Sequence, residues 1–176
     1  NLSPNGKDFA AQVDYLLGSR RNTRFLRRSP AYGKLEMLTT SLAPADKAAA
    51  GQLDRVDAPR WDGKIFADRC VGCHCTAVDA NSRAFSATSL DCFVCHGNVD
   101  LAHTKDARRV LLSKSNLEPR EVVSLCGQCH LRGGKSKSTG LPYANTFVPG
   151  DNLFRDFQVD LSDAGIAALP EEDRHV

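Results

Sequence analysis

Three five-residue stretches share one pattern: Cys70-Val-Gly-Cys73-His74, Cys92-Phe-Val-Cys95-His96 and Cys126-Gly-Gln-Cys129-His130. They contain six of the seven cysteines and three of the five histidines of the 176-residue chain. Each stretch places two thiols about one helical turn apart and an imidazole directly after the second thiol. We call them the first, second and third frames, and we expect them to determine how the chain folds.

The frames have the C-x-x-C-H spacing that attaches c-type haem. The two thiols can each add to a vinyl group of one porphyrin, and the adjacent histidine can bind the iron. Zinc and thiol-redox sites also use C-x-x-C. A zinc site takes its four ligands from a pair of such frames, and three frames cannot all be grouped into pairs. The pattern therefore predicts three haems. They are held by Cys70, Cys73, Cys92, Cys95, Cys126 and Cys129, with His74, His96 and His130 as iron ligands.

Three six-coordinate irons need three further ligands, yet only His103 and His175 lie outside the frames. We expect His103 to bind the iron of a neighbouring haem. His175 lies one residue from the end, where a solvated side chain is an equal alternative. At least one iron therefore needs Met37, the Asn1 amine or a histidine from another chain, or keeps an open site. We favour the partner histidine or one beyond this sequence, because Met37 also fits a core position.

The rest of the chain shows few long regular elements. Alternating apolar residues in 12–40 predict a small antiparallel β-hairpin of two or three strands. A helix capped by Asn116 is expected to run into Cys126, with Val122, Val123 and Leu125 on its apolar face. Shorter helices are expected within 105–114 and 162–169. We therefore expect a mainly irregular and α-helical chain with a small N-terminal β-hairpin, a multihaem cytochrome c fold organised around three covalent haems.

The same features suggest three segments. Residues 1–60 would form the hairpin and a connector, residues 61–135 the three-haem core, and residues 136–176 a loop-rich tail. Cys75 belongs to no frame, and we expect it to be buried as a small apolar residue. Five arginines lie within residues 20–28, either as a solvated face of the hairpin or as partners of haem propionates.

Composition excludes some classes of function. The formal net charge is only +2, which argues against a nucleic-acid binder. The apolar runs are far shorter than the ~20 residues that span a bilayer, so no transmembrane segment is expected. The chain opens N-L-S-P-N-G-K-D-F with no basic and apolar leader. We expect an exported product whose signal peptide has been removed, or a chain that starts late.

Several stretches resemble bacterial multihaem c-type cytochromes and are similar to the tetrahaem cytochrome c of ammonia oxidisers. These are Q-V-D-Y-L-L-G-S-R-R-N-T-R-F-L-R-R with G-K-L-E-M-L, W-D-G-K-I-F-A-D-R-C-V-G-C-H, D-C-F-V-C-H-G-N-V-D-L-A-H, C-G-Q-C-H-L-R-G-G and F-V-P-G-D-N-L-F. The resemblance implies that His103 is a distal haem ligand and that haems lie in close pairs. Asn98 and Val99 replace the usual Pro-Gly, and Cys75 replaces a typical Thr. Further frames common in the family are missing, which suggests a piece of a longer chain or ligands from partner chains.

The expected function is electron transfer through three haems, as a wire subunit of a larger assembly or filament in the periplasm or outside a bacterial cell. Partners would be redox proteins, other cytochrome chains, or copies of the chain that supply a distal ligand. The alternative is the haem subunit of a redox enzyme with one open iron, acting on small nitrogen or sulfur compounds.

Overall fold

The computed structural model describes residues 12–18, 23–42, 53, 59–97 and 117–169. The chain divides into two compact units, Asn1–Ala67 and Asp68–Val176. The three-segment organisation expected from the sequence stays a prediction. The short helix expected within 105–114 lies outside the described residues. Within the described ranges, no helix is both long and apolar enough to cross a membrane.

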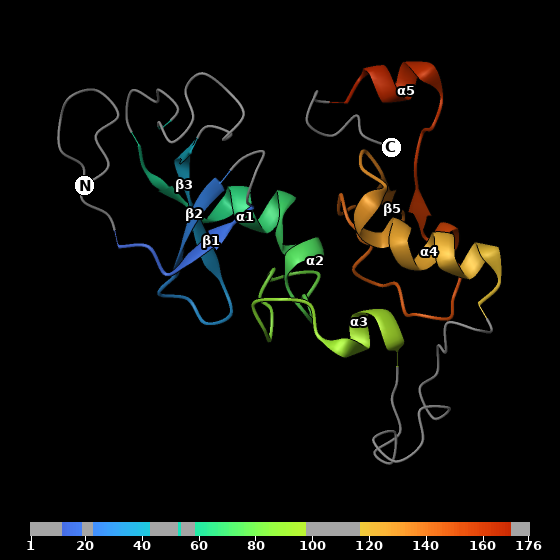
Figure 1. The fold of residues 1–176 in the computed structure, drawn as a ribbon, viewed down its shortest axis with the longest axis horizontal. Coiled ribbons are helices and arrows are strands. Elements are labelled where there is room, and N and C mark those ends of the chain that lie inside the picture. Colours follow the sequence, from blue (N-terminus) through green and yellow to red (C-terminus); the bar gives the residue numbers. More distant parts are fainter. Residues whose placement is uncertain (1–11, 19–22, 43–52, 54–58, 98–116, 170–176) are drawn as a thin grey trace, which may run out of the picture. The chain divides into compact units, whose positions relative to one another are not determined.

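The first unit contains a four-stranded antiparallel sheet in the order β1-β2-β3-β4 (Figure 1). The strands are β1 (Tyr15–Leu17), β2 (Thr23–Arg28), β3 (Leu35–Leu42) and β4 (Trp61–Asp62). Helix α1 (Gly63–Arg69) follows β4 directly. The strand β3 pairs with a neighbour on each side, and its Leu38 is fully buried. Met37 is 3% exposed, which confirms the expected core position.

Two arginines of the cluster within residues 20–28, Arg27 and Arg28, form side-chain contacts within the sheet. The Arg27 guanidinium donates to Glu36 at 2.6 Å and lies 4.7 Å from the centre of the Trp61 ring. Arg28 donates to the Tyr15 hydroxyl at 3.0 Å. These contacts favour the interpretation of the cluster as one face of the sheet.

The second unit combines short helices with a small sheet. The helices are α2 (Val71–His74), α3 (Cys92–His96), α4 (Pro119–His130), the 3₁₀ turn η3 (Leu153–Arg155) and α5 (Asp163–Ala167). The strands β5 (Lys135–Ser136) and β6 (Phe157–Gln158) form the antiparallel pair. The helices that were expected to run into Cys126 and to lie within 162–169 are both confirmed.

The fold class expected from the sequence is wrong. Instead of a mainly irregular and helical chain with one small hairpin, the described residues form a four-stranded sheet, a second two-stranded sheet and five helices. Among them, no group of three or more His, Cys, Asp or Glu is arranged to hold a metal ion, so no organisation around three haems is seen. Strand β4 is two residues long and joins β3 across residues 43–60. Local alternation does not reveal such a distant pairing.

Candidate functional site: three cysteine and histidine frames

The first frame lies at helix α2. Cys70 precedes the helix, and the backbone N–H of His74 donates to the Cys70 carbonyl at 3.1 Å. His74 ends the helix with an exposed side chain. Loss of solvation around the ring, together with the charge of Arg132, lowers the pKa of His74 below its usual value. The imidazole is therefore neutral at neutral pH, which is the form that binds metals.

The second frame forms the whole of helix α3. The Asp91 carboxylate caps its N-terminus and accepts from the backbone N–H of Phe93 at 2.9 Å. The helix ends at Gly97, whose positive φ of 67° suits a residue without a side chain. Cys92, Cys95 and His96 are all exposed.

The third frame occupies the last turn of α4. A capping box between Glu118 and Glu121 starts this helix, so the cap is Glu118 and not the predicted Asn116. Ser124 and Gly127 form its buried side, and the backbone N–H of Leu153 donates to the Ser124 hydroxyl at 3.2 Å.

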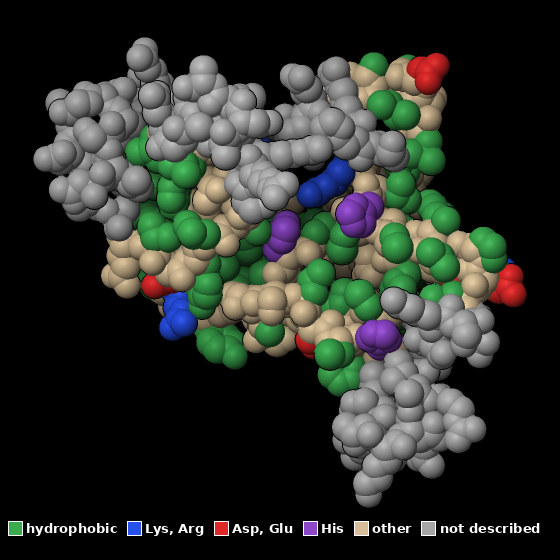
Figure 2. Space-filling view, in the orientation of Figure 1, with side chains coloured by type: hydrophobic (Ala, Val, Ile, Leu, Met, Phe, Trp, Pro, Cys, Tyr) green, Lys and Arg blue, Asp and Glu red, His purple; other side chains and the backbone are tan. Residues whose placement is uncertain are grey.

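The opposite side of α4 is exposed, and two residues of the predicted apolar face lie on it. Val122 is 42% and Val123 51% exposed. Cys126 and His130 follow at the helical spacing that places all four side chains on one face. Figure 2 shows the histidine side chains of the described residues on one face of the second unit, with apolar side chains beside them.

The second cysteine of the first frame lies against the third frame. The Cys73 sulfur lies 3.9 Å from the Gln128 carbonyl and 4.0 Å from the Cys129 carbonyl. A hydrogen bond from the Cys129 thiol lowers the pKa of Cys73 to about 7, and the same bond raises the pKa of Cys129. Cys95 adds to the rise in the pKa of Cys129. The three frames are therefore neighbours, although the sequence separates them widely.

Thr76 and Gln128 connect the frames to one another. The Thr76 hydroxyl accepts from the backbone N–H of Asp91 at 3.0 Å, which ties the segment after the first frame to the residue that caps the second. The Gln128 side-chain amide donates to the Val94 carbonyl at 3.2 Å, which ties the third frame to the second. Sequence reasoning missed both residues, because Thr76 lies outside the frames and Gln128 fills a position that the frame pattern leaves variable.

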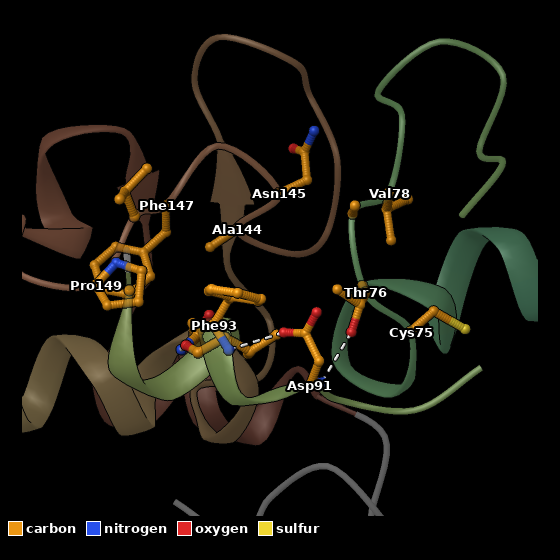
Figure 3. Close-up of a pocket in the computed structure, with 15 residues that line it drawn as sticks. Cys75, Thr76, Val78, Asp91, Phe93, Ala144, Asn145, Phe147 and Pro149 are labelled. Atoms are coloured by element: carbon orange, nitrogen blue, oxygen red, sulfur yellow. Dashed lines mark hydrogen bonds between the residues drawn. The ribbon is translucent and has the colours of Figure 1, made fainter. Parts of the chain in front are cut away.

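A cavity of about 370 Å³ lies beside these contacts (Figure 3). Its lining includes Thr76, Phe93, Val94, Gln128 and Phe147, so all three frames or their neighbours border it. Figure 3 shows the Cys75 sulfur pointing away from Asp91 and Phe93.

The cysteines outside and inside the frames differ in burial. Cys75 is 4% exposed, which confirms the expected burial, and that burial raises the pKa of its thiol to about 12. None of the seven cysteines forms a disulfide in the structure. His103, His175 and Asn1 lie outside the described residues.

Comparison with protein-family models, with curated proteins and with solved structures gives no match.

Proposed function

We propose that the chain transfers electrons through three c-type haems bound covalently at the three frames. The observation that carries this proposal is the repetition of one arrangement three times. Each frame has two cysteines that form no disulfide and lie about one turn apart, and an exposed histidine at the last residue of a helix. Thioether attachment fits thiols that form no disulfide: the S–H adds across a vinyl group, sulfur bonds one carbon, and the hydrogen goes to the other. No oxidant is consumed.

The side chains around the frames also fit an apolar porphyrin. Phe93, inside the second frame, is 54% exposed, and Val122 and Val123 are exposed on the face of α4 that carries Cys126 and His130. Large apolar side chains in solvent are costly, and a flat apolar group bound to the adjacent thiols would cover them. The residues present are therefore suited to haem.

Bound haem would supply iron that takes up and releases one electron. The chain contributes the positions of the attachment points. Because Gln128 of the third frame contacts Cys73 of the first and Val94 of the second, groups attached at the three frames would be held near one another. Electrons would enter from a reduced donor protein and leave to an oxidised acceptor, as expected of a wire subunit in a periplasmic or extracellular assembly. Other cytochrome chains or copies of this chain would supply missing distal ligands.

Intact mass and visible absorption test the proposal. The chain is exported to the periplasm of a host that carries the enzymes of c-type haem attachment. We expect the mass of three haems and a c-type α-band after reduction. Replacing both Cys126 and Cys129 with Ala should leave two haems. The matched control is Cys75→Ala, which lies outside the frames and should keep three. Parent protein without covalent haem would refute the proposal.

The count of histidines favours one further candidate function. Three irons share only two histidines outside the frames, so one open iron would make the chain a haem subunit of a redox enzyme. Electron paramagnetic resonance of the oxidised, haem-loaded protein separates the two. Only low-spin ferric signals support the wire, and a high-spin ferric signal supports the enzyme.

A further inference from the structure

Gln128 occupies the second variable position of the third frame and touches both other frames. Its side-chain amide donates to the carbonyl of Val94, the residue at the same position of the second frame, at 3.2 Å. The same amide donates to the Leu125 carbonyl of its own helix at 2.9 Å. Its backbone carbonyl lies 3.9 Å from the sulfur of Cys73 in the first frame.

The bond to Val94 has a clear physical role. Val94 lies in the last turn of the five-residue helix α3, where carbonyl groups have no partner within the helix. The Gln128 amide satisfies one such carbonyl from a neighbouring helix. The bond also fixes the distance between α3 and the end of α4, because both of its ends belong to attachment frames.

We infer that Gln128 is a positioning residue whose side-chain amide sets the geometry between the second and third haems, and thereby their electronic interaction. This inference rests on the proposed function. The N–H donor of the side chain is the part that matters. An apolar side chain of equal length would fill the same space without forming the hydrogen bond to the Val94 carbonyl. The interaction between two haem transitions depends steeply on their separation and angle, so a small shift of α3 is measurable.

Circular dichroism in the Soret region of the haem-loaded chain tests the inference. Close haems give a paired positive and negative band. We expect Gln128→Met and Gln128→Glu, which cannot donate to Val94, to keep three haems by mass and to lose most of the band-pair amplitude. Gln128→Lys restores a donor of similar reach and should retain most of it. Gln158→Met, on the exposed side of β6, is the matched control and should match the parent.

Each outcome decides the question. A parent with three haems and no band pair, or equal amplitudes in the parent, Met and Glu proteins, overturns the inference and leaves the proposed function standing. Equal loss in all three Gln128 variants also overturns it, because side-chain shape would then matter and the donor would not. If the Met and Glu variants fail to load haem while Lys loads three, the donor requirement is upheld. A parent without haem refutes the proposed function itself.

Discussion

The ring of Tyr143 lies directly over the α-carbon of Gly72 in the first frame. A β-carbon built on Gly72 would stand 2.2 Å from two ring carbons of Tyr143, which is well inside van der Waals contact. Tyr143 is 3% exposed, so the ring has little room to move away. The contact couples the first frame to the loop between β5 and η3. Only glycine fits at position 72 beside this ring.

Gly72→Ala should therefore destabilise the protein by about 1–3 kcal/mol, as overpacking of a tight contact does. It should also reduce attachment at the first frame, so that part of the sample carries two haems. Urea unfolding and intact mass measure the two effects. Gly63→Ala is the control, because its β-carbon would meet atoms no nearer than 3.7 Å. Equal unfolding midpoints for Gly72→Ala and the parent would contradict the prediction.

The N-cap of α3, Asp91, should be needed for haem attachment at the second frame. Asp91→Ala removes the acceptor for the Phe93 N–H and should cost about 1 kcal/mol. We expect a lower haem content because the helix that aligns Cys92 and Cys95 frays. Ser162→Ala removes the corresponding cap of α5, where the hydroxyl accepts from Gly165 at 3.1 Å. That control should lose similar stability and keep three haems by mass.

The exposed valine face of α4 should matter only when haem is bound. Val123→Ser should change the stability of the haem-free chain by less than about 0.5 kcal/mol, as at most surface positions. In the haem-loaded chain it should cost about 1 kcal/mol, because the valine is then covered. Leu161→Ser, also exposed, should leave both forms unchanged. Equal effects of Val123→Ser on the two forms in urea unfolding would argue against haem on this face.

The stability of the second unit should depend on pH through the carboxylate of Asp156. Its carboxylate accepts from Ser136 at 2.5 Å, from the Ser138 backbone at 2.8 Å and from Thr146 at 3.0 Å, and these bonds lower its pKa to about 2. Because the pKa is lower in the folded state than the usual ~3.9, the ionised carboxylate stabilises the fold above about pH 4. This contribution is lost as the pH falls from about 4 to about 2.

Urea unfolding between pH 2 and pH 6 checks this expectation. Asp156→Asn should flatten the dependence of the unfolding midpoint on pH in this range. Asp163→Asn, at an exposed position of α5, is the control and should retain the slope of the parent. The same slope in the Asp156 variant and the parent would show that another group is responsible.

Local patterns predicted part of this structure well. The helix leading into Cys126, the helix near the C-terminus and the buried positions of Met37 and Cys75 were all readable from neighbouring residues. The antiparallel pairing of β1, β2 and β3 also agrees with the hairpin expected within 12–40. The addition of β4 and the pairing of β5 with β6 were not readable, because these strands are two residues long and pair across long segments. The exposed side of α4 was also missed, since helical spacing shows which residues share a face but not whether that face is covered.

The sequence by itself determined the chemistry of the three frames, because two thiols and an imidazole within five residues are set by one turn of backbone. Only the tertiary structure brought the frames together. Cys73 and Gln128 are 55 residues apart in sequence, and Gln128 and Val94 are 34 apart. Contacts at such separations depend on how the whole second unit packs, so no local pattern reveals them. The tertiary structure thus made Gln128, a variable position of one frame, a residue that contacts both of the other frames.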